Sequence, residues 1–355
     1  MKKITQLLLI AGFIFAGQCF VYGQYGKIAR QHNDTLTTYT DLIAAITASV
    51  NGDTLYLPGG PVYASNSTII INKSLTIIGA GHYPDSTVAT YQTTIAGTIK
   101  IVTGADGGVL CGVKCNTLWF GTSASNQNVN NYRIMRCNIT GELYPSFTGQ
   151  SLSQNILISE CIINTSSVWT SNYFTTVLFE KNIIHVDPTY YYGGSGLFNN
   201  CIFYNGYVTF FTNSAYNTFN NCIIIQSGPN SNLSIGSTLT IFNNLLVSYI
   251  LPTNPSVTYN GPYFFNTITK EPTTSTFVNA NTTSFAYTNN YHVQATSNGH
   301  NAGNDGTDVG IYGTPIPYKE SAVPFNPHIS SKTIGTVTTP TWTLNVDIKV
   351  SAQDR

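Results

Sequence analysis

The stretch that decides the fold is GLFNNCIFYNG, Gly196–Gly206, because it is nearly repeated as NTFNNCIIIQSG, Asn217–Gly228. Both copies contain Phe-Asn-Asn-Cys-Ile, and Cys222 follows Cys201 by 21 residues. A single globular core has little use for the same five residues twice, whereas a solenoid rebuilds the same environment in every coil. The repeat therefore predicts a solenoid.

The position of the repeated cysteine recurs at near-constant intervals in both directions. Steps of 22, 24, 21, 19, 21 and 23 residues join seven positions: Cys115, Cys137, Cys161, Asn182, Cys201, Cys222 and Leu245. Such spacing predicts coils of short strands joined by loops of adjustable length, and about eleven or twelve coils in this chain.

The residues around this reference position form columns. Three residues before it the column is apolar, which predicts an inward stack: Gly112, Ile134, Ile158, Phe179, Phe198, Phe219 and Phe242. One residue before it the column is polar: Lys114, Arg136, Glu160, Lys181, Asn200, Asn221 and Asn244. Asn tolerates left-handed backbone and can hydrogen-bond an identical residue one coil away. One residue after the reference, Ile162, Ile183, Ile202 and Ile223 also stack, and the sequence leaves open whether they face out or are covered.

Composition limits the possible partners. Only 8% of the 355 residues are charged and the formal net charge is zero. Nucleic acid and acidic membrane surfaces both require a basic face, so neither is expected as a partner.

Residues 1–23 have the pattern of a cleaved signal peptide. Lys2 and Lys3 precede an apolar run, and small residues lead to a predicted cleavage site after Gly23. Cys19 raises lipidation as an alternative, although Gln18 is not the small residue that such a site needs before the cysteine. No second apolar stretch is long enough to span a bilayer. We therefore expect a secreted or cell-surface protein.

The rest of the chain divides by pattern. Residues 24–39 are a lead-in, 40–313 the solenoid, 314–333 a proline-rich extended linker, and 334–355 a small β appendage packed on the last coil. Within Thr38–Asp53 we predict an amphipathic helix that caps the first coil, with Thr40 or Asp41 at its N-terminus. In the appendage, alternating residues predict a strand around Leu344–Val350, with Thr336–Thr339 as a weaker partner. A type IX outer-membrane secretion signal is an alternative interpretation of this tail.

Two ends of the solenoid region carry a family resemblance. GDTLYLPGGPVY, Gly52–Tyr63, and STIIINKSLTIIGAG, Ser67–Gly81, resemble the opening coils of right-handed parallel β-helix, or pectin-lyase-like, proteins of secreted bacterial type. NAGNDGTDVGIYG, Asn301–Gly313, resembles their closing coil. The resemblance implies an all-β, right-handed parallel β-helix with an N-terminal capping helix. It indicates the fold better than the reaction, because one scaffold carries many activities.

Six cysteines remain after removal of the signal peptide. Stacked cysteines in register have Cβ atoms about 4.8 Å apart, which exceeds the roughly 3.8 Å of a disulfide. Buried free thiols are therefore expected, with a Cys111–Cys115 pair across a turn as the exception left open.

The resemblance implies two catalytic chemistries on polysaccharides. Hydrolases of this fold carry clustered Asp, but Asp106 and Asp187 are the only aspartates between Asp85 and Asp305. Lyases pair a Lys or Arg base with calcium held by acidic or Asn side chains. The lyase hypothesis takes Lys114, Arg136 and Lys181 as catalytic residues and Glu160 and Glu180 as ligands of a calcium cofactor. The alternative is an exposed ladder of ion pairs, Arg136–Glu160–Lys181.

Aromatic residues suggest glycan contact without catalysis. Tyr190, Tyr191 and Tyr192 form one predicted loop, and Trp119 and Trp169 lie near strand ends. Exposed rings on a rigid solenoid can stack on sugars, although core packing is an alternative. Asp305 and Asp308 suit either calcium or a tight turn. The first hypothesis is therefore a non-catalytic glycan-binding or cell-envelope structural module, and the second is a calcium-assisted lyase of uronic-acid glycans. The sequence does not indicate the oligomeric state.

Overall fold

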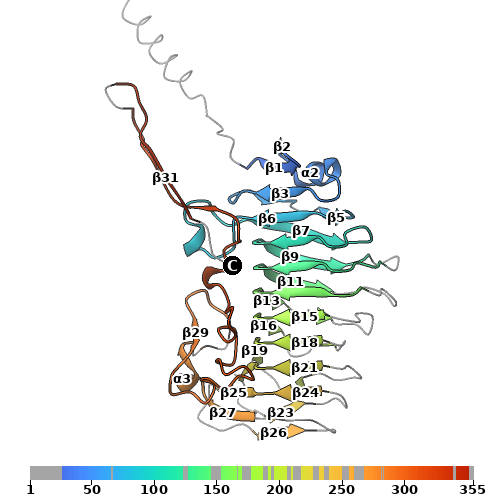
Figure 1. Ribbon diagram of the computed structural model, residues 1–355, viewed down its shortest axis with the longest axis vertical. Coiled ribbons are helices and arrows are strands. Elements are labelled where there is room, and N and C mark those ends of the chain that lie inside the picture. The colour runs from blue at the N-terminus through green and yellow to red at the C-terminus, as the bar shows by residue number, and fades with distance from the viewer. Residues whose placement is uncertain are drawn as a thin grey trace, which may run out of the picture.

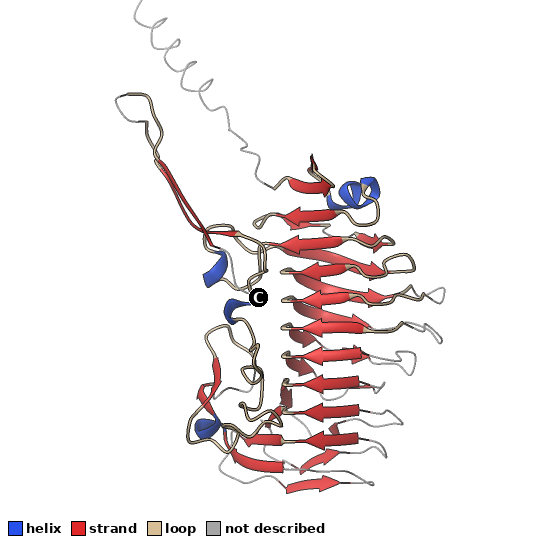
Figure 2. Ribbon diagram, in the orientation of Figure 1, coloured by secondary structure: helices blue, strands red, loops and turns tan. Residues whose placement is uncertain are grey.

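The protein is a solenoid of stacked parallel strands (Figure 1, Figure 2). This computed structural model describes residues 26–64, 67–122, 127–144, 153–165, 167–169, 177–186, 191–192, 196–205, 209–210, 217–226, 232–235, 240–249, 256–259, 268–280, 282, 284–338 and 341–351. The predicted signal peptide and Tyr190 lie outside these residues. The expected all-β parallel solenoid is confirmed.

One face of the solenoid is an eleven-stranded sheet, here called the first sheet. All neighbours in it are parallel except the antiparallel β2, β1 and β3 at its N-terminal end. Its strands, in spatial order, are β2 (Thr35–Tyr39), β1 (Ile28–His32), β3 (Thr54–Leu57), β6 (Thr76–Gly79), β8 (Val109–Cys111), β10 (Arg133–Met135), β12 (Ile156–Ser159), β15 (Val177–Glu180), β18 (Gly196–Asn199), β21 (Asn217–Asn220) and β24 (Thr240–Asn243). The described strands thus stack fewer levels than the eleven or twelve coils expected.

The second sheet follows the first around each coil. Its path is β27 (Ile268–Pro272), β25 (Leu245–Tyr249), β22 (Ile223–Gln226), β19 (Ile202–Asn205), β16 (Ile183–Val186), β13 (Ile162–Thr165), β11 (Asn138–Tyr144), β9 (Lys114–Phe120), β7 (Thr94–Ile101) and β4 (Val62–Tyr63). β7, β9 and β11 each contain a register shift, after which their second halves pair with one another. The second halves of β7 and β11 also pair with separate short strands. We call these second halves the side part of the sheet, together with β5 (Thr68–Ile71), β14 (Ser167–Trp169) and β17 (Tyr191–Tyr192).

A separate sheet of β20 (Thr209–Phe210), β23 (Asn232–Ile235) and β26 (Ser256–Tyr259) lies on later coils.

The predicted phenylalanine column lies in the core. Phe198 stacks on Phe179 and Phe219 with ring centroids 4.7 and 4.8 Å apart, and all three are buried. Phe242 pairs with Phe219 in register. These residues recur because stacked coils place identical side chains above one another at the spacing of neighbouring strands.

The predicted register of the earliest aligned coil was wrong by two residues. Ile134 pairs with Leu110 and Met135 with Cys111, so Gly112 stands beside Arg136 and Val113 takes the reference position. Cys115 instead pairs with Ile139, and Lys114 pairs with Asn138 in the next strand. Lys114 is therefore not a member of the polar column.

The N-terminal cap is confirmed. Helix α2 (Leu42–Ala48) begins after Asp41, whose Oδ1 accepts a hydrogen bond of 2.7 Å from the amide of Ala44, and Leu42, Ala45 and Ile46 are buried. The lead-in forms the hairpin β1–β2. Buried Asp53 holds this hairpin by pairing with Arg30 Nε and His32 Nδ1, each at 2.6 Å.

After β27 the chain turns back along the outside of the solenoid (Figure 1). We call the described residues between 277 and 325 the return segment. They include β28 (Phe277–Asn279), β29 (Asn290–Val293) and η2 (Glu320–Ala322), and α3 (Thr273–Thr276) precedes them; η1 (Asp85–Thr87) lies earlier in the chain. The return segment packs apolar side chains on the isoleucine column of Ile183, Ile202 and Ile223, which is fully buried. Residues 301–313 are thus no closing coil, and residues 314–323 are packed against the solenoid instead of forming an extended linker.

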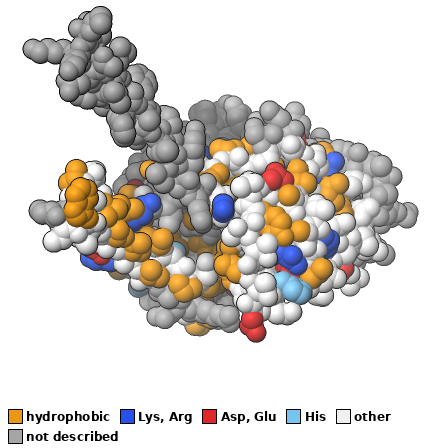
Figure 3. Space-filling view, turned by 90° about the horizontal axis from the view of Figure 1, so that it is seen from above, with side chains coloured by type: hydrophobic (Ala, Val, Ile, Leu, Met, Phe, Trp, Pro, Cys, Tyr) orange, Lys and Arg blue, Asp and Glu red, His pale blue; other side chains and the backbone are white. Residues whose placement is uncertain are grey.

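The chain ends in an antiparallel hairpin of β30 (His328–Ile334) and β31 (Val346–Ser351). It projects from the N-terminal end of the solenoid and carries exposed hydrophobic side chains (Figure 1, Figure 3). The small β appendage is confirmed, but its partner strand is not Thr336–Thr339 and it does not pack on the last coil. No helix within the described residues is long and apolar enough to cross a membrane.

Candidate functional site

A column of residues with left-handed backbone follows the strands of the first sheet. We call it the turn column: Gly112, Arg136, Glu160, Lys181, Asn200, Asn221 and Asn244. The φ of Gly112 is 68°, and the others lie between 51° and 54°. This conformation turns the chain sharply into the second sheet. It costs a residue other than Gly, Asn or Asp roughly 1–2 kcal/mol, so the Arg, Glu and Lys need compensating contacts.

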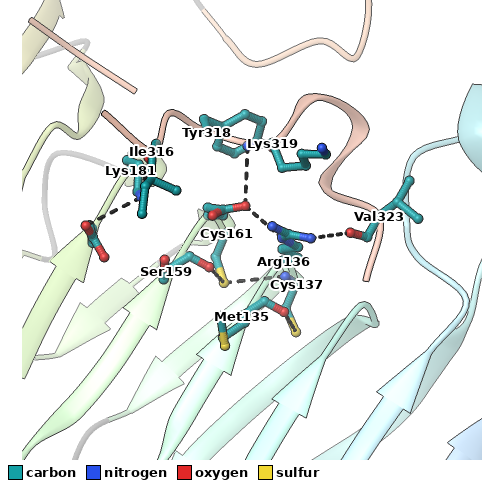
Figure 4. A network of polar contacts seen from close by, with 12 residues as sticks. Met135, Arg136, Cys137, Ser159, Cys161, Lys181, Ile316, Tyr318, Lys319 and Val323 are labelled. Carbon is teal, nitrogen blue, oxygen red and sulfur yellow. Dashed lines mark hydrogen bonds and ion pairs between the residues drawn. The ribbon is translucent and has the colours of Figure 1, made fainter. Parts of the chain in front are cut away.

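The return segment supplies these contacts in reverse sequence order (Figure 4). Arg136 Nη1 donates to the carbonyl of Val323 at 2.6 Å, and Lys181 Nζ donates to that of Ile316 at 2.8 Å. One coil further on, Asn200 Nδ2 donates to the carbonyl of Gly310 at 3.1 Å.

Asn221 continues the series, because its carbonyl accepts from the amide of Gly310 at 2.7 Å and its Oδ1 from the amide of Asn304 at 3.0 Å. The turn column is therefore a seam that binds the backbone of the return segment.

An ion pair lies buried within this seam. Arg136 Nε is 2.7 Å from Glu160 Oε2, and the two side chains are only 3% and 6% exposed. The guanidinium also lies over the ring of Phe325, 3.8 Å from its centroid. Lys181 pairs with Glu180 at 3.5 Å, and Glu180 is one third exposed. The predicted exposed ladder is thus a buried clamp, and Arg136, Glu160 and Lys181 line no groove open to solvent.

Gly112 is the member of the turn column that lacks a side chain. A Cβ built on it would lie 2.2 Å from Cγ of Pro324 in the return segment. The glycine therefore serves both the left-handed turn and the close approach of the proline.

The two asparagines of the repeated motif have different roles. The first Asn of each copy faces outward and forms a ladder. Asn220 Nδ2 donates to Asn199 Oδ1 at 2.8 Å, and Asn243 Nδ2 donates to Asn220 Oδ1 at 2.7 Å. The second Asn lies in the turn column, where Asn244 Nδ2 donates to Asn221 Oδ1 at 3.3 Å. The predicted left-handed backbone and coil-to-coil hydrogen bond of the Asn column are both present.

The cysteine of the motif caps backbone carbonyls next to the turn. Cys201 Sγ donates to the carbonyl of Phe179 on the preceding coil at 3.5 Å, and Cys222 donates likewise to that of Phe198 at 3.4 Å. Where Asn182 replaces the cysteine, its Nδ2 donates to the equivalent carbonyl, that of Ile158, at 2.7 Å. A small buried donor is therefore what the position requires.

All six described cysteines are free and buried, including Cys111 and Cys115. Burial raises the pKa of the Cys115, Cys137 and Cys222 thiols well above its ordinary value, so they are neutral thiols without nucleophilic character.

Lys114 lies near a second buried polar cluster. Its neighbour in register, Asn138, donates from Nδ2 to the hydroxyl of Tyr287 at 2.7 Å, and this hydroxyl is 3.3 Å from His82 Nδ1. Burial, with the charge of Lys114 as a smaller cause, lowers the pKa of His82 to about 3. The structure thus separates Lys114 from the other two predicted catalytic residues.

This buried histidine makes stability depend on pH. Below about pH 6.5 the unfolded chain binds a proton at His82 that the folded protein does not bind. The free energy of unfolding therefore falls as the pH drops from about 6.5 toward 3. The fall is at most about 1.4 kcal/mol per pH unit. Denaturant titrations at pH 7 and 5 should show a smaller loss in His82→Gln than in the parent. Equal losses in His82→Gln and the parent would contradict this assignment.

The acidic residues do not converge on a cation. Asp305 Oδ1 accepts from the amide and hydroxyl of Thr307, and these bonds lower its pKa despite partial burial. Asp308 pairs with His300 at 2.8 Å. Within the described residues no group of three or more His, Cys, Asp or Glu side chains could hold a metal.

Aromatic residues share one register position on the side part of the second sheet. Trp119 pairs with Tyr144, and Trp169 pairs with Tyr192. The pairing of Leu143 with Val168, one residue earlier, joins the two pairs into one column over four successive coils. We call Trp119, Tyr144, Trp169 and Tyr192 the aromatic column.

The neighbours of Trp119 show that its own side chain lies on the outer surface. Leu118 and Phe120 on either side of it are buried in the core, whereas Trp119 is partly exposed. Its partner on the preceding coil, Lys100, places Nζ 4.7 Å from the indole centroid, and Ile70 beyond it is half exposed. Tyr191 pairs with Val168, in register with Leu143 and Leu118, so it is not a member of the aromatic column.

The fold defines the chain as a parallel β-solenoid. No protein-family model matches it, and no curated protein matches its sequence.

Proposed function

We propose that the protein is an exported, non-catalytic solenoid that binds a glycan along its aromatic column. The observation that carries the proposal is the shared backbone register of Trp119, Tyr144, Trp169 and Tyr192, together with the partial exposure of the Trp119 side chain. Aromatic rings offer a flat apolar surface with a polar edge, which suits the faces and hydroxyls of sugar rings. A rigid column with a spacing of about 4.8 Å presents such surfaces in a line.

The buried seam favours binding over catalysis. A lyase needs its base and its cation in a groove that substrate can enter, but Arg136, Glu160 and Lys181 are buried and bonded to the return segment. Lys114, the remaining predicted catalytic residue, lies apart from them beside Asn138 and His82. No observation therefore favours the calcium-assisted lyase, and the predicted leader supports export only as an expectation from sequence.

Affinity electrophoresis tests this proposal. In gels containing neutral or uronic-acid polysaccharides, the parent should be retarded by at least one glycan, and Trp119→Ala should weaken binding about fivefold, equivalent to roughly 1 kcal/mol of ring contact. Trp342→Ala is the matched control, because Trp342 is 87% exposed but lies outside the solenoid. It should migrate as the parent does.

Two results would contradict the proposal. Equal retardation of Trp119→Ala and the parent would show that the aromatic column is not the binding site. Release of unsaturated uronate products by the parent, seen as ultraviolet absorbance, would show a lyase in place of a binding module.

A further inference from the structure

A groove of about 540 Å³ lies on the outer face of the first sheet near its N-terminal end, below the end of the return segment. Its floor is built by β6, β8 and β10, and its wall by Pro324, Phe325 and Asn326. This volume falls in the range of about 300–1,000 Å³ typical of small-molecule sites. The groove is on a different sheet from the aromatic column.

One outward column of the floor is apolar within the groove and polar beyond it. Ile78, Cys111 and Met135 form one outward column of paired residues in β6, β8 and β10. On the next three coils the same column continues as Ser159, Glu180 and Asn199. The second outward column of these strands changes in the opposite sense: Thr76, Val109 and Arg133 lie in the groove, and Leu157, Leu178 and Leu197 follow beyond it. The groove therefore has an apolar column on one side and a column that contains Arg133 on the other.

The wall is held in place by the seam. Phe325 rests on the guanidinium of Arg136, which the buried pair with Glu160 fixes. Pro324 packs against Gly112, where no side chain fits between them. The groove is therefore formed before any ligand binds, which lowers the entropic cost of binding.

The charged side chains that line the groove and the hollow beside it are basic. Arg133 lies at its floor and makes no ion pair with any described residue. An adjoining hollow of about 290 Å³, which shares Ile78, Pro324 and Asn326 with the groove, is lined by Lys27 and His328. No described residue lining either hollow is acidic, although the whole chain has 15 Asp and Glu against 15 Lys and Arg.

We propose that this groove binds an amphipathic organic anion. Its apolar body lies on Ile78, Val109 and Met135 against Phe325, and its carboxylate or sulfonate pairs with Arg133. Arginine suits this role because its planar fork donates two parallel hydrogen bonds to such a group. Cys111 contributes only a neutral surface, because burial raises the pKa of its thiol.

Anilinonaphthalene sulfonate, a fluorescent apolar anion, serves as the probe. Titrated into the folded protein, it should bind the parent in the groove, and Arg133→Gln should weaken binding about tenfold through loss of one charge-assisted pair, equivalent to about 1.4 kcal/mol. Lys349→Gln is the matched control, because Lys349 is a cation on the exposed apolar hairpin and lines neither hollow. It should leave the affinity unchanged.

A neutral dye distinguishes the loss of the Arg133 charge from a loss of the folded structure. Nile red should bind the parent and Arg133→Gln with the same affinity, since only the ion pair is removed, and Val109→Glu should weaken both dyes. The proposal is overturned if Arg133→Gln binds the anionic probe as tightly as the parent, or if Lys349→Gln weakens it as much as Arg133→Gln does. It is also overturned if Arg133→Gln weakens Nile red as much as it weakens the anion.

Discussion

Replacing Phe219 by alanine should lower the free energy of unfolding by about 3–5 kcal/mol, the usual range for a buried phenylalanine. The ring is 1% exposed and stacks 4.8 Å from that of Phe198, while its backbone pairs with Phe242 on the other side. Removing it leaves a cavity beside the ring of Phe198, which is itself buried and stacked on Phe179. Denaturant titration of the parent and Phe219→Ala measures the loss.

Thr218→Ala provides the control, because Thr218 precedes Phe219 in β21 and points to the other side of the strand. We expect it to change stability by about 0.5 kcal/mol or less, as for most surface substitutions. A loss below about 1 kcal/mol in Phe219→Ala would contradict the inward register of the phenylalanine column.

The second large effect is expected at Glu160. Glu160→Ala leaves the guanidinium of Arg136 buried without its carboxylate, which typically costs about 3–5 kcal/mol. Because Arg136 also supports Phe325, the end of the return segment should loosen as well. Thermal and denaturant unfolding would measure the first effect, and limited proteolysis within residues 314–327 the second.

Glu180→Ala is the matched control for this prediction. Glu180 lies one coil further on, is 33% exposed and pairs with Lys181 at 3.5 Å. Because Lys181 keeps its hydrogen bond to the carbonyl of Ile316, the loss of Glu180 should cost clearly less than the loss of Glu160. Replacing the buried pair together, as Arg136→Met with Glu160→Leu, should recover much of the stability, because no uncompensated charge remains. Similar losses in Glu160→Ala and Glu180→Ala would mean that the seam is not a buried clamp.

The sequence predicted the parts of the fold that repeat locally. Phe198, Phe219 and the asparagines beside them recur at constant spacing, and this spacing is set by the stacking of coils. The capping helix was predictable because Asp41 and the buried face of α2 lie within a few residues of one another. In both cases the interactions that decide the structure connect residues at a known sequence separation.

The misplaced first coil shows where the repeat is ambiguous. The repeated residue is cysteine, so Cys115 matches the reference position by residue type, but Val113 fills that position. The available signal was Gly112, since glycine just before the reference position is the ordinary substitute for a left-handed Asn. Correcting this register removes Lys114 from the polar column and with it one third of the predicted catalytic set.

The return segment could not be predicted from local patterns. Arg136 and Val323 are 187 residues apart, and nothing in the spacing of the repeat connects them. The sequence held one sign of the return segment. Ile183 and Ile184 are both apolar, although successive residues of a strand face opposite sides of the sheet. Two apolar faces on one strand indicate that both are covered, and here the core covers Ile184 and the return segment covers Ile183. Without this cover, the charged column resembles an exposed ladder or a catalytic site.

Hydrogen exchange tests most directly whether the turn column holds the return segment. In the parent, peptides from residues 303–325 should exchange slowly, as the core strands do, and much more slowly than the exposed hairpin of β30 and β31. In a triple variant, Arg136→Ala with Lys181→Ala and Asn200→Ala, the same peptides should exchange faster while β18 and β21 stay protected. If residues 303–325 of the parent exchange as fast as the hairpin, or if the triple variant leaves their exchange unchanged, the turn column does not act as a clamp.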